Sequence, residues 1–169
     1  MKLTFRKSDI GDLQYVWQII KDAKRIMLEN GRHQWTEEYP SYDRIESDIM
    51  SGDAYVACND KGLILAYAYI TSQPEPAYDS PTVNWLSHDS YMVIHRLAVS
   101  AASRGIGLGK AMLQHAEHIC HDKGISSIKV DTNYDNVEML HLLSVLGYTH
   151  CGTVSYGARG ERLAFEKVL

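Results

Sequence analysis

The chain contains few cysteines and no long run of apolar residues. Its three cysteines are odd in number, widely spaced and without a C-x-x-C pair, so neither a disulfide framework nor a zinc knuckle is expected. We predict that Cys58, Cys120 and Cys151 are small buried or half-buried thiols. The longest apolar run, residues 63–70, is far shorter than the roughly 20 residues that a membrane helix requires. A membrane-spanning protein is therefore not expected.

An excess of charge of either sign is also missing. The formal net charge is -4, so the chain offers no broad cationic surface for a nucleic-acid backbone. Residues 1–5 are already charged and strand-like, which argues against a signal peptide and predicts a cytoplasmic protein. The length suits one core, so we expect a single domain over residues 1–169, with neither nucleic acid nor membrane as a partner.

Hydrophobic periodicity predicts an alternation of strands and helices. Strands are expected over residues 2–7, 54–58, 63–71, 91–99, 126–131, 148–156 and 163–168. Helices are expected over residues 10–27, from 42 to about 50, over about 106–122 and from about 136 to 146. The strand-helix-strand run ending at residue 131 is typical of a parallel crossover. The order of elements therefore predicts a mixed α/β fold, a sheet with helices on both faces.

The most informative stretch joins the strand of residues 91–99 to the following helix through the sequence S-A-A-S-R-G-I-G-L-G-K. Three alternating glycines, Gly105, Gly107 and Gly109, precede or open the helix. A glycine loop at a helix N-terminus presents free backbone N–H groups and the positive end of the helix dipole, which together bind phosphate. The stretch therefore predicts a ligand that carries phosphate.

Spacing separates three kinds of phosphate loop. A Walker A loop is excluded because no hydroxyl residue follows Gly-Lys, and a dinucleotide fingerprint is excluded because Lys110 or Met112 stands where its third glycine belongs. What remains is R-x-x-G-x-G, formed by Arg104, Gly107 and Gly109. This pattern, directly after a strand that ends in L-A-V, resembles the acyl-CoA loop of the GNAT N-acetyltransferase superfamily.

A second pattern supports the resemblance. In the family an asparagine starts the last core helix and Leu-Gly-Phe/Tyr ends it, and Asn136, Leu146, Gly147 and Tyr148 fit this spacing. The resemblance covers residues 91–148. It implies a mixed, mostly antiparallel sheet of six to seven strands with a central parallel βαβ unit.

The resemblance also implies an activity, the transfer of an acetyl group from the cosubstrate acetyl-CoA to an amine, without a metal. The loop amides would wrap the pyrophosphate of CoA, and Asn136 would contact its pantetheine arm. A bulge in the preceding strand would free a backbone N–H of Leu97 or Val99 for the thioester carbonyl. The implied CoA-binding residues are Leu97, Ala98, Val99, Arg104, Gly105, Ile106, Gly107, Leu108, Gly109, Lys110 and Asn136.

Amine acetylation also requires a proton acceptor, because an ammonium must be deprotonated before it attacks. His95 is the candidate general base, since an imidazole accepts protons at neutral pH. The run H-R-L-A-V is similar to the corresponding strand of the serotonin N-acetyltransferase branch, in which a histidine at this offset takes part in proton removal. The alternative is a histidine that only makes local hydrogen bonds.

One position departs from the family pattern. Many members carry a tyrosine seven residues after the helix asparagine, where it protonates the leaving thiolate, but this chain has Leu143 there. The thiolate then leaves unaided, takes a proton from water, or takes it from a tyrosine elsewhere in the chain. This departure keeps open a second class of function, a CoA-binding sensor or regulatory module that has lost turnover.

The acceptor is expected to meet loops rich in aromatic side chains. Trp35, Tyr39 and Trp85, together with His95, are the predicted substrate-binding residues, since they lie in or beside segments without regular periodicity. The alternative for residues 32–41 is a loop pinned to the core by its two rings. We expect a primary amine on a small molecule as the acceptor, with a protein N-terminus or lysine as the alternative. A homodimer is a family-level expectation only.

Two further sets of charged or titratable residues invite simpler interpretations. Arg96 and Arg162 could neutralise an acidic acceptor, although ion pairs at strand edges are the commoner explanation. His115, His118 and His121 fan around a helix and cannot converge on one metal ion, so a solvated helix face is predicted.

Overall fold

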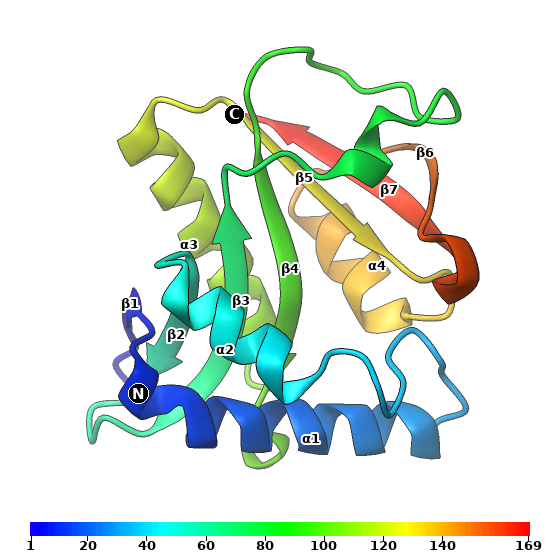
Figure 1. Ribbon diagram of the computed structural model, residues 1–169. Coiled ribbons are helices and arrows are strands. Elements are labelled where there is room, and N and C mark those ends of the chain that lie inside the picture. The colour runs from blue at the N-terminus through cyan, green and yellow to red at the C-terminus, as the bar shows by residue number, and fades with distance from the viewer. The chain divides into compact units, whose positions relative to one another are not determined.

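The computed structural model describes residues 1–169 and contains seven strands and four α-helices (Figure 1). The strands are β1 (Thr4–Lys7), β2 (Ala54–Cys58), β3 (Ile64–Thr71), β4 (Met92–Val99), β5 (Ser127–Thr132), β6 (Thr149–Ser155) and β7 (Glu161–Val168). The helices are α1 (Leu13–Glu29), α2 (Tyr42–Met50), α3 (Leu108–Lys123) and α4 (Val137–Val145). Short 3-10 turns are η1 (Ile10–Asp12), η2 (Pro76–Asp79), η3 (Ala101–Ser103) and η4 (Gly157–Arg159). Every strand and helix predicted from periodicity is present.

The strands form one mixed sheet, hydrogen-bonded in the order β1-β2-β3-β4-β5-β7-β6. β4 and β5 pair in parallel, with Met92 opposite Ile128 and Val93 opposite Lys129, and α3 connects them. The pairs β1–β2, β2–β3, β5–β7 and β6–β7 are antiparallel. The predicted mostly antiparallel sheet with a parallel βαβ unit is thus confirmed.

The chain divides into two compact units. Unit 1 contains residues 1–71 and 95–115, and unit 2 contains residues 72–94 and 116–169. β4 and α3 each contribute residues to both units. The expectation of a single domain over residues 1–169 stays a prediction.

The core of unit 1 is built by apolar faces of α1, α2, β2 and β3. Figure 1 shows α2, in cyan, in front of β2 and β3. Helical spacing on α1 and α2 and alternation on β2 direct the buried side chains to one cluster. Its members are Leu13, Val16, Ile19, Ile20, Trp35, Ile45, Ile49, Ala54, Val56, Cys58, Ile64, Tyr67 and Ala98.

The opposite face of the sheet in unit 1 is covered by α3. Val56 packs in the core with α1 and α2, whereas its neighbour Tyr55 contacts the ring of His115 on α3, at 5.8 Å between ring centroids. Because successive side chains of a strand point to opposite faces, these contacts place α3 across the sheet from α1 and α2. The prediction of helices on both faces is confirmed in this unit.

His115 corrects one prediction made from the sequence. Its ring stacks on Phe5 with centroids 4.6 Å apart and is half-buried, so the predicted solvated face is wrong for this residue. His118 and His121 are exposed, as predicted. The difference arises because His115 faces aromatic rings of β1 and β2, a pairing that helical spacing alone does not reveal.

In unit 2, residues 73–91 form an ordered excursion over β5, β6 and β7 (Figure 1). Glu166 of β7 is fully buried and accepts hydrogen bonds from the backbone N–H of Leu86 at 2.5 Å and from the hydroxyl of Ser127 at 2.7 Å. At Gly152 the excursion approaches the strand so closely that a Cβ atom would clash with the carbonyl oxygen of Thr82. The excursion is therefore fixed by buried hydrogen bonds and close backbone packing.

The three cysteines are buried and free, as predicted from their number and spacing. Each is a small side chain inside the fold rather than a partner in a disulfide. None of the helices is both long enough and apolar enough to cross a membrane.

Candidate functional site

The central feature of unit 1 is an irregularity in β4. Arg96 has a φ of +54°, in the left-handed region, and it is the one non-glycine residue with a positive φ. Such a conformation costs of order 1–3 kcal/mol and persists only where surrounding contacts determine it. The strand is therefore irregular at the position where the bulge is expected, with its left-handed residue immediately before Leu97. We call this irregularity at Arg96 the bulge of β4.

The bulge turns two consecutive side chains toward one aromatic ring. The imidazole of His95 lies 6.0 Å from Tyr69 between ring centroids, and the guanidinium carbon of Arg96 lies 5.0 Å from the centroid of the same ring. In a regular strand these neighbours would point to opposite faces. The left-handed Arg96 thus places the candidate base and an arginine on one side of the strand.

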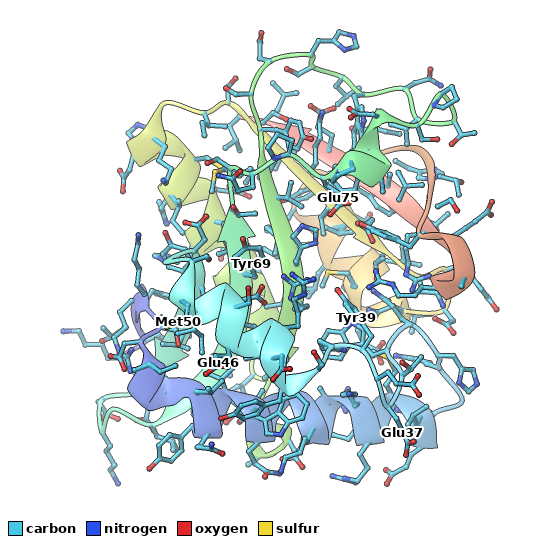
Figure 2. The ribbon with its side chains drawn as sticks, in the orientation of Figure 1. Glu37, Tyr39, Glu46, Met50, Tyr69 and Glu75 are labelled. Carbon is cyan, nitrogen blue, oxygen red and sulfur yellow. The ribbon has the colours of Figure 1, made fainter.

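Arg96 forms a buried, two-pronged ion pair with Asp48 of α2. Its Nε atom lies 2.6 Å from Oδ2 and its Nη2 atom 2.7 Å from Oδ1, and the two side chains are 8% and 2% exposed. The third nitrogen, Nη1, donates to the hydroxyl of Tyr39 at 3.0 Å, and the hydroxyl of Tyr67 donates to Asp48 at 2.9 Å. Figure 2 labels Tyr39 and Tyr69, the two tyrosines that contact Arg96.

The electrostatics of this pair follow from its burial. Burial lowers the pKa of Arg96, but the hydrogen bonds to Asp48 and the charge of that carboxylate outweigh it, so the net pKa is raised. Burial, followed by the charge of Asp48, raises the pKa of Tyr67 well above that of a free phenol. Arg96 therefore stays protonated and Tyr67 remains a hydrogen-bond donor at any physiological pH.

The glycine loop follows β4 and begins α3. Gly105 and Gly107 have φ values of +80° and +86°, and a Cβ atom at either would meet nothing within 4 Å. Glycine is thus needed for the left-handed backbone rather than for close packing. Arg104 and Lys110 are exposed, whereas Leu108 is buried and anchors the first turn of α3. The loop is therefore a left-handed glycine turn with open space beside Gly105 and Gly107 and exposed cationic side chains before and after it.

The predicted substrate-binding residues of unit 1 have different surroundings. Trp35 is 7% exposed and packs within the core cluster, which agrees with the alternative that its ring pins residues 32–41 to the fold. Tyr39 is half-buried and holds Arg96 through its hydroxyl. The sequence did not single out Asp48 or Tyr69, because no motif connects them to β4.

The remaining predicted site residues lie in unit 2. Asn136 is the N-cap of α4, and its Oδ1 atom accepts a hydrogen bond from the N–H of Met139 at 3.3 Å. Trp85 donates from Nε1 to the carbonyl oxygen of Tyr78 at 2.8 Å, and its ring lies 4.4 Å from Nζ of Lys129. Leu143, at the position of the family tyrosine, is fully buried.

Unit 2 also contains a buried polar cluster that sequence reasoning missed. Asp131 accepts hydrogen bonds from the hydroxyls of Tyr78 at 2.7 Å and Tyr156 at 2.6 Å. Burial raises the pKa of Asp131, although both phenols and the charges of Arg162 and Arg159 oppose the rise. Arg162, considered as a binder of an acidic acceptor, donates to the carbonyl oxygens of residues 159 and 161. Because the two tyrosines lie 53 and 25 residues from Asp131, no local pattern reveals the cluster.

Comparison with known proteins agrees with this geometry. A solved GNAT-family acetyltransferase from Streptococcus agalactiae 2603 is 31% identical, covers 99% of this chain and 95% of its own, and superposes with a TM-score of 0.88. Another GNAT-family acetyltransferase, from Listeria monocytogenes 4b F2365, shares the fold at 23% identity and a TM-score of 0.77, with coverage of 99% and 95%.

A further relative and a family model also identify acetyltransferases as the proteins that this chain resembles. The uncharacterised N-acetyltransferase YesJ of Bacillus subtilis (strain 168) is 26% identical over 149 residues, which is 86% of this chain and 81% of the relative. The model of the acetyltransferase (GNAT) family matches residues 15–148, which include the bulged strand, the glycine loop and the helix that Asn136 caps. The chain therefore belongs to the GNAT acetyltransferase family.

Proposed function

We propose that this protein transfers an acetyl group from acetyl-CoA to a primary amine on a small molecule, by direct attack of the amine on the thioester. The observation that carries the proposal is the succession, within unit 1, of His95, the left-handed Arg96 and the open glycine loop at the start of α3. Neighbouring positions of the chain thus carry a candidate base, a strand backbone with an irregular conformation and a candidate phosphate-binding loop. Acyl transfer from CoA uses all three.

The residues of the loop fit the diphosphate of CoA. The first N–H groups of α3 have no intrahelical partner, and the helix dipole adds partial positive charge at the same place. The left-handed glycines curve the loop without placing side chains in its opening. Arg104 and Lys110 add cationic side chains at its ends, so the loop matches a dianionic ligand in charge.

The backbone after Arg96 is proposed to stabilise the reacting carbonyl. As the amine attacks, negative charge builds on the thioester oxygen, and a preorganised N–H group lowers the barrier by binding that charge. The amide of Leu97 follows the left-handed residue directly and that of Val99 lies two residues further on; these are the proposed donors. Loss of one such donor typically costs 100-fold to 1,000-fold, on the order of 3 to 4 kcal/mol.

His95 is proposed to accept the proton of the attacking ammonium. Its ring is half-buried and stacked on Tyr69, an arrangement that restricts the orientation of its two nitrogen atoms. A neutral imidazole accepts a proton directly or through one water molecule. Because Leu143 cannot donate, the thiolate is proposed to leave unaided or to take its proton from water.

The acceptor proposed for this site is cationic. Glu37 and Glu38 are exposed and precede Tyr39 in the sequence, and Glu46 is a partly exposed residue of α2; Figure 2 labels Glu37, Tyr39 and Glu46. Carboxylates near a binding loop attract an ammonium and favour its charged form before transfer. They support a small, positively charged amine over an acidic acceptor.

The test measures free thiol release from acetyl-CoA with a panel of mono-, di- and polyamines, amino acids and short peptides. Saturable thiol release with a small amine, and mass-spectrometric detection of the acetylated amine, would support the proposal. Release only with peptides would replace the small acceptor by a protein N-terminus or lysine. Saturable CoA binding without release from any acceptor would favour the sensor suggested by Leu143.

A further inference from the structure

The left-handed backbone conformation of Arg96 is explained by the contacts of its side chain. Any residue with a Cβ atom is strained at a φ of +54°, and arginine has no local hydrogen bond that offsets the strain, unlike asparagine or aspartate. Glycine would adopt the same backbone without this cost. An arginine at such a position indicates that contacts of its side chain hold the backbone in place.

Those contacts use every nitrogen of the guanidinium. Nε and Nη2 bind the two carboxylate oxygens of Asp48, and Nη1 binds the hydroxyl of Tyr39. The flat face of the same group lies over Tyr69. The Oδ2 atom of Asp48 also accepts a hydrogen bond from the hydroxyl of Tyr67. Hydrogen bonds to Asp48 and Tyr39 fix the guanidinium within its plane, and the ring of Tyr69 contacts its face. The backbone of Arg96 therefore has little freedom to move.

We propose that Arg96 is a positioning residue for acetyl transfer, held by Asp48 so that the bulge of β4 directs the amides of Leu97 and Val99 toward the thioester. The inference rests on the proposed function and deepens it. Arg96 acts through the backbone of the next residues and does not touch the substrate. The hydroxyl of Tyr39, which belongs to residues 32–41, accepts a hydrogen bond from the same guanidinium and helps to hold it.

Arginine is chemically suited to this role, and lysine is not. Only a planar fork can bind both oxygens of Asp48 and still donate to Tyr39. A lysine ammonium would keep the positive charge but lose the geometry that fixes the strand. The charge of the pair is therefore secondary to its shape.

The test compares two substitutions that remove the same side chain and differ only in backbone freedom. Arg96→Ala loses the ion pair and keeps a Cβ atom that disfavours the bulge, whereas Arg96→Gly loses the ion pair and permits it. We expect kcat to fall about 100-fold in Arg96→Ala, the loss that a misplacement of about 1 Å produces, and about 10-fold or less in Arg96→Gly. The KM for the amine and the Kd for CoA should stay within about twofold of wild type in both variants.

Two matched variants complete the design. Arg25→Ala removes an exposed arginine from the surface ion pair with Glu29 and should leave kcat unchanged. Arg96→Lys should resemble Arg96→Ala in kcat, because it keeps charge and Cβ but lacks the fork. If both small substitutions at position 96 prevent folding, Asp48→Asn replaces them. It keeps the size of the side chain but leaves one acceptor oxygen in place of two, so it breaks the two-pronged geometry and should lower kcat alone.

Equal losses of kcat in Arg96→Ala and Arg96→Gly would overturn the proposal, because backbone freedom would then be irrelevant. A loss confined to the KM of the amine would overturn it as well, by showing that Arg96 contacts the acceptor. An NMR readout separates this inference from the proposed function. In ¹⁵N-labelled protein the amide signals of Leu97 and Val99 should shift in Arg96→Ala and stay near wild type in Arg96→Gly, even if no amine is acetylated.

Discussion

The imidazole of His95 stacks on the phenol ring of Tyr69, with ring centroids 6.0 Å apart and ring planes 25° from parallel. Tyr69 belongs to β3 and His95 to β4, so two strands determine where the candidate base points. The ring of Tyr69 also supports Arg96. One aromatic side chain therefore holds both residues at the start of the bulge.

If His95 is the general base, its removal should lower the rate and change its pH dependence. We expect His95→Ala to reduce kcat/KM about 100-fold or more at neutral pH, the range that general base catalysis contributes. The pH dependence of kcat/KM should therefore differ between wild type and the variant. His118→Ala removes an exposed histidine and serves as the control. An unchanged rate and profile in His95→Ala would assign His95 a structural role only.

The backbone of the glycine loop should determine CoA affinity. Gly107→Ala introduces a Cβ atom at a φ of +86°, where it meets no neighbour, so its effect is conformational strain of roughly 1–2 kcal/mol. We expect a tenfold or greater rise in the Kd for CoA, measured by calorimetry. Gly62→Ala, at a φ of +79° between β2 and β3, imposes the same strain outside the loop and should leave that Kd unchanged. If Gly107→Ala and Gly62→Ala bind CoA with the same Kd, the loop is not the diphosphate site.

The hydroxyl of Tyr148 should lower the free energy of unfolding relative to a phenylalanine at the same position. It is buried without a hydrogen-bond partner, and burial raises the pKa of this phenol far above its usual range. An unsatisfied buried hydroxyl costs about 1–3 kcal/mol, so Tyr148→Phe should raise the free energy of unfolding by about 1 kcal/mol in urea denaturation. Tyr67→Phe is the matched control of opposite sign, because its hydroxyl binds Asp48. A loss of stability in Tyr148→Phe would indicate a partner for the hydroxyl.

The start of the first helical segment should be sensitive to acid. Asp12 binds Arg6 at 2.7 and 2.9 Å and accepts the N–H of Asp9. The hydrogen bond from Arg6 lowers the pKa of Asp12 in the folded state, against the opposing effect of burial. A depressed folded pKa adds stability above the unfolded pKa of about 3.9, and that stability is lost as the pH falls through the folded value.

The corresponding experiment compares urea denaturation of wild type and Asp12→Asn between pH 7 and pH 2. Wild type should be the more stable at pH 7. The difference should shrink below about pH 4, where Asp12 becomes protonated first in the unfolded chain and, at lower pH, in the folded protein. Asp60→Asn removes an exposed carboxylate and is the control. A difference that is independent of pH would show that the charge of Asp12 does not contribute.

Local sequence predicted the elements and the glycine loop because both depend on neighbours along the chain. The pattern R-x-x-G-x-G identified residues 104–109, and the structure has left-handed backbone at Gly105 and Gly107. The N-terminal position of Asn136 on α4 was likewise predicted, and the structure shows its side chain capping that helix. Glycine conformation and helix capping are decided within a few residues, so a motif is enough to find them.

The contacts of the candidate site could not be predicted in this way. Asp48 and Arg96 lie 48 residues apart, and Tyr39 reaches Arg96 over 57 residues. Trp35 was expected to face the acceptor, yet it is buried in the core. Which aromatic ring packs inside and which one meets a functional group depends on the packing of whole elements, and the pattern of residues 32–41 does not contain that information.

The sequence by itself determined the order of strands and helices, the glycine loop and the family resemblance, since each follows from local periodicity, glycine content or spacing. Only the tertiary structure decided that Arg96 occupies the left-handed position of β4 and that Asp48, Tyr39 and Tyr69 surround it. The physical reason is that a strained backbone conformation is maintained by buried contacts from distant parts of the chain, and those contacts exist only once α2, β3 and β4 are packed together.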